Sequence, residues 1–391
     1  MPGEREMKIV DIEATPIRVI PSRGRINLLV EVKTDEGLTG IGEAEAGRKP
    51  GEIAMGMKSL IEKGYRQVLL GEDPRDHRYL YEKMLNYTWY SETGMGMCAL
   101  AGVDMALIDL AGKSMQVPAC RVLGGCYRTK VRAYASHPFV TPKTIDDACR
   151  EAAELVEKGF TGVKMTFSWF KGFGDNLKED IRYVKLIRDA IGYGIDLAIS
   201  ENAPNRGVAK AIRIARALEE YDLLFWEDAL PRGELEQYAQ LSAAVDLPIE
   251  AGEKVVNQML KYFIFRRAVD AINPEVTNNS LSETKKIADL AYAAGIKTYP
   301  HNHGSIVGAV ANLHLVASMP DGDLVEYRTS DPDPSMLELL VDPPKFRNGY
   351  FEVPQTPGLG IELDRRVVEK LKLGQETPGE VASEIHDYPR W

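Results

Sequence analysis

Polar side chains close five successive short apolar runs of this sequence, about one β/α unit apart. Four are carboxylates and one is an imidazole: Glu227, Glu253, Glu275, His301 and Glu326. If the runs are parallel strands of a barrel, their carboxyl ends form a single face, and the five groups point to one place. Carboxylates beside an imidazole predict a metal ion and a general base.

Glu227 and Glu253 are the candidate metal ligands, because they end successive units and would lie on neighbouring strands. Their oxygens could converge on Mg²⁺, which proteins usually hold with few carboxylates plus water and substrate. A single Glu at the end of a strand is more often a solvated or salt-bridged group. Two of them in successive units favour a metal site.

His301 is the candidate general base, and Glu275 ends the preceding strand. A carboxylate at that position could bond one ring nitrogen and raise the basicity of the other. His303 competes for the role, because it faces the same side as His301 if the pleat of the strand continues. A lone histidine after a strand is commonly structural, and it is Glu275 that favours catalysis here.

Lys164 and Glu326 are further candidates at the same face. Lys164 could hold a substrate carboxylate and stabilise developing negative charge, or it could form a salt bridge at the mouth of the barrel. Glu326 could be an acid whose pKa is raised by burial, or it could bond a substrate hydroxyl. The sequence leaves these alternatives open.

Composition narrows the class of protein. The chain has 391 residues, 44% of them hydrophobic, which indicates one large and one smaller domain. Its formal charge of −10 argues against a nucleic-acid-binding surface. The four cysteines form no CxxC pair, and the N-terminus shows neither a signal h-region nor an apolar run that could span a bilayer. We predict a reduced, cytoplasmic enzyme with no nucleic-acid or membrane partner.

The pattern of elements predicts an α/β fold, a TIM-like (β/α) barrel preceded by an α+β domain. Strand-like runs at 7–20, 26–33 and 37–44 suggest an antiparallel meander, followed by helical patterning at 52–64, 75–86 and 96–115. From residue 131, short apolar runs alternate with amphipathic helices, and eight strands start at about 131, 161, 195, 222, 247, 270, 296 and 323. We place the N-terminal α+β domain at 1–128, the barrel at 129–350 and a C-terminal segment that returns to the N-terminal domain at 351–391.

Several motifs extend this prediction: GVDMALIDLAGK at 102–113, Leu123-Gly124-Gly125, Trp226-Glu227, Gly252-Glu253 and Pro300-His301. Together they resemble the mandelate racemase and acid-sugar dehydratase branch of the enolase superfamily. The resemblance implies a modified TIM (β/α) barrel with an α+β capping domain, formed by the N-terminal third and the C-terminal tail. It also implies a Mg²⁺ ion that stabilises an enediolate formed from a carboxylate substrate, and a symmetric homo-oligomer. It further implies site roles by position: metal ligands at Glu227 and Glu253, a base at His301, an acid at Glu326, and the first lysine of a Lys-x-Lys motif at Lys164.

Three positions depart from the pattern that the resemblance implies. Thr166 replaces the second lysine, so a two-base racemisation loses one base. Glu275 replaces the usual Asp partner of the histidine. Ser200 replaces the first metal-binding Asp, which leaves three alternatives: Glu201 takes over as a ligand, the metal is held weakly through water and Asn202, or it is absent.

Three functions follow from these residues. We favour Mg²⁺-dependent dehydration of a sugar acid, since a single base at His301 can serve both proton transfers. A racemase, epimerase or cycloisomerase is the alternative. The resemblance to the cycloisomerase branch implies a lysine at the end of the sixth strand, and residues 273–278 contain none. A non-catalytic protein with a degraded metal site is the third. We assign Asn202, His303 and Arg25 to substrate binding, with Arg25 in a cap loop suited to an anionic ligand.

Overall fold

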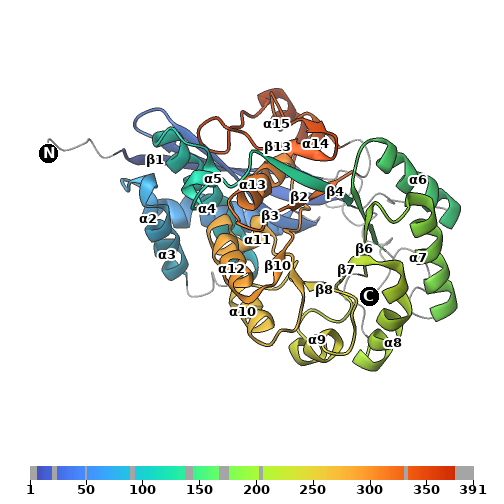
Figure 1. The fold of residues 1–391 in the computed structure, drawn as a ribbon. Helices are drawn as coiled ribbons and strands as arrows, with labels where there is room; N and C mark the ends of the chain where they lie inside the picture. The colour runs from blue at the N-terminus through green and yellow to red at the C-terminus, as the bar shows by residue number, and fades with distance from the viewer. Residues whose placement is uncertain are drawn as a thin grey trace.

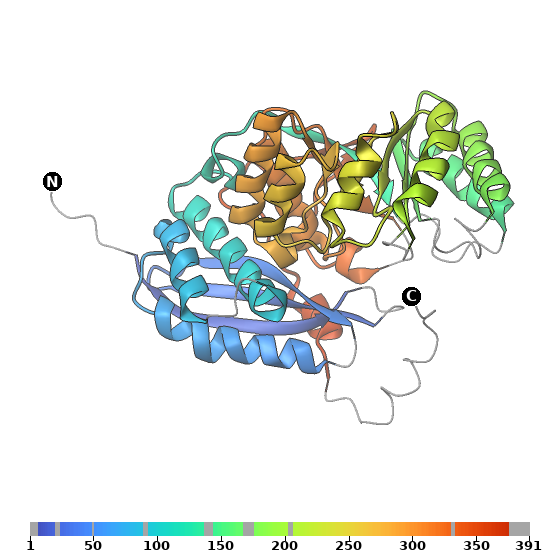
Figure 2. The ribbon, with the colours of Figure 1, turned by 90° about the horizontal axis from the view of Figure 1, so that it is seen from below.

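A computed structural model describes residues 7–19, 24–48, 51–88, 93–136, 144–166, 176–201, 206–329 and 333–374. An N-terminal sheet with its helices lies against a parallel α/β barrel, as Figures 1 and 2 show from two directions. The predicted fold class, a modified TIM barrel with an α+β capping domain, is confirmed.

The N-terminal sheet is an antiparallel meander. Its strands pair in chain order: β1 (Ile9–Arg18), β2 (Arg25–Thr34) and β3 (Thr39–Arg48). Alternate apolar side chains such as Ile12, Leu28 and Val30 form one core with the helices that follow. Because successive side chains of a strand face opposite sides, this alternation decides which face of the sheet meets the helices.

The capping helices occupy the chain from residue 52 to residue 114. They are α1 (Glu52–Ser59), α2 (Arg66–Leu69), α3 (His77–Tyr87) and α4 (Gly94–Ser114), with a π-helical turn at Leu60–Tyr65 and a 3-10 turn at Pro74–Asp76. By length and composition alone α4 could cross a membrane, but 78% of its most apolar window is buried inside the protein. Its residues contribute to the capping core through Val103 and to the core shared with the barrel through Met105. Helix α4 is therefore the core helix that joins the two parts.

The barrel contains all eight predicted strands. They are β4 (Lys130–Ser136), β5 (Gly162–Thr166), β6 (Asp196–Ser200), β7 (Leu223–Glu227), β8 (Ile249–Ala251), β9 (Ala271–Ile272), β10 (Lys297–Thr298) and β11 (Leu324–Arg328). Neighbouring strands are parallel in the order β10-β9-β8-β7-β6-β5-β4, and β11 pairs with the other side of β4. Parallel strands place all their carboxyl ends at one face.

Helices cover the outside of the barrel, where Figure 1 shows them as green to orange coils. They are α6 (Ile145–Glu157), α7 (Leu177–Ile191), α8 (Val208–Leu218), a 3-10 turn (Glu219–Tyr221), α9 (Leu235–Ser242), α10 (Asn257–Phe265), α12 (Leu281–Ala294) and α13 (Ile306–Ala317). Two short helices, α5 (Ala119–Val122) and α11 (Val276–Asn279), pack against α4 of the capping domain. Helix α12 ends at Gly295, whose φ of +74° is the left-handed conformation that glycine adopts without strain.

The C-terminal segment contains α14 (Pro334–Leu337), β12 (Phe346–Arg347), β13 (Tyr350–Glu352) and α15 (Arg365–Leu371). After β13 pairs with β4, the chain reaches the capping domain, where Leu359 donates its backbone N–H to Asp109 at 2.7 Å. The N–H of Leu373 bonds the carbonyl of Pro16 at 2.9 Å. Figure 2 shows α15 beside the N-terminal sheet. The domain boundaries at 128/129 and 350/351 stay predictions.

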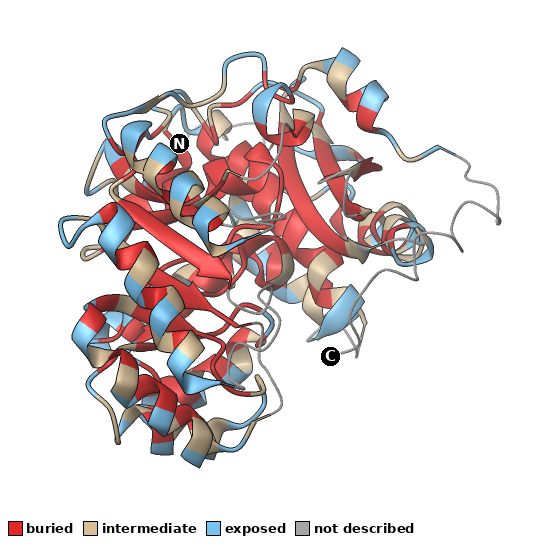
Figure 3. Ribbon diagram, turned by 90° about the vertical axis from the view of Figure 1, so that its right-hand side faces the viewer, coloured by how far each residue is buried: buried red, intermediate tan, exposed pale blue. Residues whose placement is uncertain are grey.

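An apolar layer fills the barrel interior, and Figure 3 shows the strands as buried along their length. The layer consists of one inward side chain from each of several strands: Tyr134, Ala198, Phe225, Ala271, Tyr299 and Leu324. Two residues further along the strands, the inward positions become polar, for example Ser200 after Ala198 and Glu227 after Phe225. Side chains two residues apart on a strand point to the same side, so the polar residues that follow the apolar layer also point into the barrel.

Candidate active site

Lys164 lies between two carboxylates in this polar layer. Its Nζ is 2.7 Å from Oε2 of Glu227 and 2.8 Å from Oε1 of Glu326. Burial lowers the pKa of Lys164, but the two carboxylates raise it well above its ordinary value. Glu326 also accepts hydrogen bonds from the hydroxyl of Ser136 and from the backbone N–H of Asn302. The structure thus brings three predicted site residues into one buried ionic cluster.

His301 and Glu275 form a direct pair. Nδ1 of His301 lies 2.8 Å from Oε2 of Glu275, and the ring is 1% exposed. Glu275 is itself held in place, because it accepts the backbone N–H groups of His303 at 3.0 Å and Thr277 at 3.3 Å. We assign the ring proton to Nδ1, facing the carboxylate, which leaves Nε2 as the basic atom. Burial lowers the pKa of His301, but the nearby carboxylates, Glu253 foremost, raise it to about 9.

Glu253 faces the basic atom of this pair, with Oε1 3.7 Å from Nε2 of His301. The same carboxylate lies 3.3 Å from Nη2 of Arg232 and 3.7 Å from Nζ of Lys254. Burial raises the pKa of Glu253, but the charges of His301, Lys254 and Arg232 hold it well below its ordinary value. Glu253 is therefore an ionised carboxylate beside the imidazole.

His303 and Arg25, both predicted to bind substrate, lie on the capping side of His301. The rings of His301 and His303 meet edge to face with their centres 4.3 Å apart. Arg25 reaches across from β2 of the capping sheet, and its Nη1 donates to the backbone carbonyl of His303 at 3.2 Å. The capping domain thus supplies one wall of the site.

Glu201 lies apart from the predicted metal ligands. Its carboxylate bonds Nη2 of Arg206 at 2.6 Å, and the Arg206 guanidinium lies over the ring of Trp226, which belongs to the core between strands and helices. Burial raises the pKa of Glu201 to about 7, although Arg206 opposes the shift. This pairing with Arg206 disfavours Glu201 as the replacement for the missing ligand, and that role stays a prediction. Strand alternation turns Glu201 outward because Ser200 faces inward.

Ser200 and Thr166, the two neutral substitutions, are both buried and lie opposite one another on β6 and β5. The polar layer therefore has hydroxyls where the family pattern has charged groups. Asn202, predicted to contact substrate, lies outside the described residues.

Glu250 is a site residue that the sequence analysis missed. It lies opposite Glu227 on the neighbouring strand and is fully buried. Neither of its carboxylate oxygens has a hydrogen-bond partner among the described residues. Burial and then the charge of Glu227 raise its pKa well above the ordinary value. Glu250 stands three residues before Glu253 in the same apolar run, but only its pairing with Glu227 on the neighbouring strand assigns it to the site. Arg232, in the loop after β7, had no signal in the sequence either.

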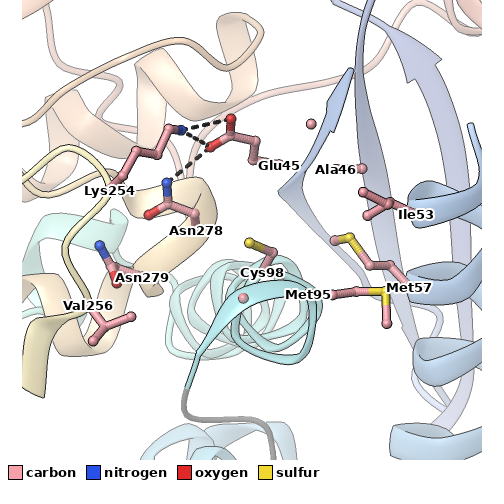
Figure 4. Close-up of a pocket in the computed structure, with 12 residues that line it drawn as sticks. Glu45, Ala46, Ile53, Met57, Met95, Cys98, Lys254, Val256, Asn278 and Asn279 are labelled. Atoms are coloured by element: carbon pink, nitrogen blue, oxygen red, sulfur yellow. Dashed lines mark hydrogen bonds and ion pairs between the residues drawn. The ribbon is translucent and has the colours of Figure 1, made fainter. Parts of the chain in front are cut away.

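A cavity of about 330 Å³ lies where the capping domain meets the barrel (Figure 4). Much of its lining is apolar or sulfur-bearing, from Ile53, Met57, Met95, Cys98 and Val256. Its polar edge is a cluster in which Glu45 accepts hydrogen bonds from Lys254 at 2.7 and 2.8 Å and from Asn278 at 3.0 Å. Because Lys254 follows Glu253 in the chain, this polar edge borders the site.

Family comparisons agree with this geometry. Residues 9–124 match the mandelate racemase / muconate lactonizing enzyme N-terminal domain, and residues 147–367 match the enolase C-terminal domain-like family. The chain belongs to the enolase superfamily.

Within the enolase superfamily, this chain resembles proteins of several names. It is 29% identical over 390 residues to D-xylonate dehydratase of Haloferax volcanii, which covers 96% of this chain and 91% of that protein. It is also 29% identical over 362 residues to D-galactarolactone cycloisomerase of Agrobacterium fabrum, with 89% and 92% covered. The crystal structure of a mandelate racemase/muconate lactonizing enzyme-like protein from Rubrobacter xylanophilus superposes with a TM-score of 0.85 at 29% identity, covering 96% of this chain and 99% of that one.

Enolase-superfamily membership implies Mg²⁺, and the donors present can be tested against that ion. Glu227 and Glu253 follow from neighbouring strands and offer hard oxygens, which suit Mg²⁺ when water and substrate complete the shell. Both oxygens of Glu250, beside Glu227, lack a hydrogen-bond partner among the described residues, and a nearby cation would favour the ionised form of this carboxyl, whose pKa burial raises. Ser200 offers only a neutral hydroxyl. The residues fit Mg²⁺ with two carboxylates, and we expect weaker binding than three would give.

Proposed function

We propose that this protein is a lyase that dehydrates a sugar acid after removing the proton α to its carboxylate. The observation that carries the proposal is the Glu275–His301 pair, buried at the carboxyl face of the barrel with its free nitrogen facing Glu253. Membership of the enolase superfamily and likeness to a D-xylonate dehydratase support the substrate class.

His301 supplies both proton transfers in this proposal. Nε2 accepts the α-proton, and the C–H electron pair moves into the substrate carboxylate to give an enediolate. When the enediolate collapses, a C=C bond forms, the β C–O bond breaks, and the protonated ring gives its proton to the departing hydroxyl. Water leaves and the ring returns to its neutral state. The neighbouring carboxylates favour the protonated ring that the second step needs, while the first step needs the neutral ring with Nε2 unprotonated.

Charge stabilisation falls to the groups around the imidazole. The ammonium of Lys164 would stabilise the negative charge that develops on the substrate carboxylate. When Mg²⁺ is bound, Glu227 and Glu253 would hold it, and it would polarise that carboxylate as a Lewis acid. Glu275 keeps the ring oriented through Nδ1, and Arg25 closes the site from the capping side.

A cycloisomerase acting on a lactone of a sugar acid is the second candidate, because a D-galactarolactone cycloisomerase matches at the same 29% identity. Both reactions begin with removal of an acidic C–H proton. Racemisation with two bases is disfavoured, because Thr166 has no basic group to serve the opposite face of the α-carbon.

The test is a screen of acid sugars and their lactones with Mg²⁺, followed by proton NMR in deuterated water. We expect loss of water from one acid sugar. An isomer of unchanged mass would favour the cycloisomerase, and no reaction with any compound of the panel would contradict both.

His301→Asn should abolish exchange of the α-proton, while His77→Asn, in the capping domain, should keep it. Retained exchange in His301→Asn would transfer the role of base to His303 or another group. A homo-oligomer is also proposed, to be measured by light scattering.

A further inference from the structure

Glu253, His301 and His303 place one ligand atom each within 4.8 Å of one another. In the part of the chain that the structure describes, no other group of three or more His, Cys, Asp or Glu side chains meets that distance. We propose that these three residues bind a borderline divalent ion of the Zn²⁺ or Co²⁺ class. The bound ion occupies the basic nitrogen of His301 and so inhibits the enzyme. The inhibitory consequence rests on the proposed function, whereas the binding site does not.

The donor set decides which ions bind. Two imidazole nitrogens and one carboxylate oxygen suit Zn²⁺, Co²⁺ and Ni²⁺, while Mg²⁺ prefers oxygens alone. Glu253 is common to this set and to the proposed Mg²⁺ ligands. The two ions therefore compete for one carboxylate, and the histidines give the advantage to the borderline ion.

Glu275 prepares His301 for this role. Metal-bound histidines usually donate their other ring N–H to a carboxylate, which fixes the tautomer and strengthens the ligand. Here Nδ1 lies 2.8 Å from Glu275, and Nε2 points to Oε1 of Glu253 at 3.7 Å. The ring already has the orientation that a ligand needs.

The backbone of His303 is held from both sides. Its N–H donates to Glu275 at 3.0 Å and its carbonyl accepts from Arg25 at 3.2 Å. Ligands of one tetrahedral zinc ion lie about 3.3 Å apart, given bonds of about 2.0 Å. Closing the set from 4.8 Å therefore needs side-chain rotation of roughly 1 to 2 Å and leaves the backbone in place. Three protein ligands leave a fourth position for water or substrate.

Two cations oppose binding and limit the expected affinity. Arg232 and Lys254 lie 3.3 and 3.7 Å from Glu253 and already neutralise part of its charge. His301 must also lose a proton before its Nε2 can coordinate. The carboxylates of Glu275 and Glu326, which raise the pKa of His301, favour a cation at the same place. We expect one ion per chain.

The experiment uses chelator-treated full-length protein without substrate. Co²⁺ is titrated while its visible absorption is followed, and Zn²⁺ binding is measured by calorimetry. We expect one equivalent of each ion, the d–d bands of a four- or five-coordinate Co²⁺ site, and no displacement by excess Mg²⁺. His303→Gln should weaken Zn²⁺ binding at least about tenfold, while His77→Gln should leave it unchanged.

A dissociation constant for Zn²⁺ above the millimolar range would overturn the proposed site. So would an equal Zn²⁺ affinity in His303→Gln and the wild-type protein. If a substrate is found, one equivalent of Zn²⁺ should abolish its turnover and chelation should restore it. Full turnover with Zn²⁺ bound would overturn the inhibition. If no acid sugar reacts, the proposed function fails while the Co²⁺ spectrum still decides the site.

Discussion

The ammonium of Lys164 lies 2.7 Å from the carboxylate of Glu227, the residue that the sequence assigned to a metal ion. Glu326 contacts the same ammonium, and Glu250 lies beside Glu227 on the next strand. A single lysine therefore sits among three buried carboxylates. The cluster retains negative charge that only protonation or a further cation can offset.

Lys164→Met should lower the free energy of unfolding by about 3 to 5 kcal/mol, because removing one partner leaves its carboxylates buried without a counter-charge. Urea unfolding measures the loss. The loss should shrink at low pH, where the carboxylates take up protons. Lys185→Met is the matched control: this exposed lysine pairs with Asp189 on the surface of α7, and such pairs contribute less than about 1 kcal/mol. Equal effects of the two substitutions would contradict the buried cluster.

Glu43 of the capping domain forms hydrogen bonds with the turn that follows His301 and His303. It accepts the backbone N–H groups of Ser305 and Gly308 at 2.8 Å each and is fully buried. Glu43→Ala leaves these donors unsatisfied, and we expect a loss of about 3 kcal/mol in the free energy of unfolding. Hydrogen exchange should also accelerate at Ser305 and Gly308.

Glu36→Ala is the control for that substitution, since Glu36 is an exposed residue of the turn between β2 and β3. It should change neither stability nor exchange. Unchanged protection at Ser305 in Glu43→Ala would show that the capping domain does not order this turn.

Gly42 allows α4 to approach the capping sheet closely. A Cβ at this position would lie 2.0 Å from the carbonyl oxygen of Gly102 in α4, so helix and sheet would have to separate. Gly42→Ala should cost about 3 kcal/mol or more and reduce the soluble yield. Gly194→Ala should be tolerated, because nothing lies within 4 Å of its added Cβ. A stable, well-expressed Gly42→Ala protein would contradict this packing.

His314 makes part of the stability depend on pH. Its Nδ1 accepts the backbone N–H of Cys120 at 3.3 Å, and its Nε2 lies 3.1 Å from the carbonyl of Leu359. Burial lowers its pKa from 6.5 to about 4. Between these values the unfolded chain binds a proton that the folded chain refuses, so stability falls as the pH is lowered from 6.5 to 4. The shift corresponds to about 3 kcal/mol.

His314→Gln should flatten this dependence, because its amide can still donate to Leu359 but does not titrate. The measurement is the urea midpoint at several pH values between 4 and 7. The stability of the wild-type protein relative to His314→Gln should fall as the pH is lowered from 7 to 4. Parallel curves for both would place the acid sensitivity elsewhere.

Much of the fold was predictable because its signals are local. Apolar runs followed by amphipathic helices mark each β/α unit, and all eight predicted strands are present, from β4 to β11. The same local signal predicted that Glu227, Glu275, His301 and Glu326 would reach one face. It could not detect Glu250, because a carboxylate inside a strand looks like any other alternating polar residue until the neighbouring strand is known.

The sequence by itself determined the order of the elements, the side of each strand that faces inward, and the membership of the catalytic face, since period and spacing are properties of neighbouring residues. Only the tertiary structure decided which polar groups pair: Lys164 with Glu227, Lys254 with Glu45, and Arg25 with the carbonyl of His303, 278 residues away in the chain. Such pairs depend on distances between strands and loops that are remote in sequence. The charges that surround His301 therefore depend on packing. These charges decide whether its Nε2 is suited to accept a proton or to bind a metal ion.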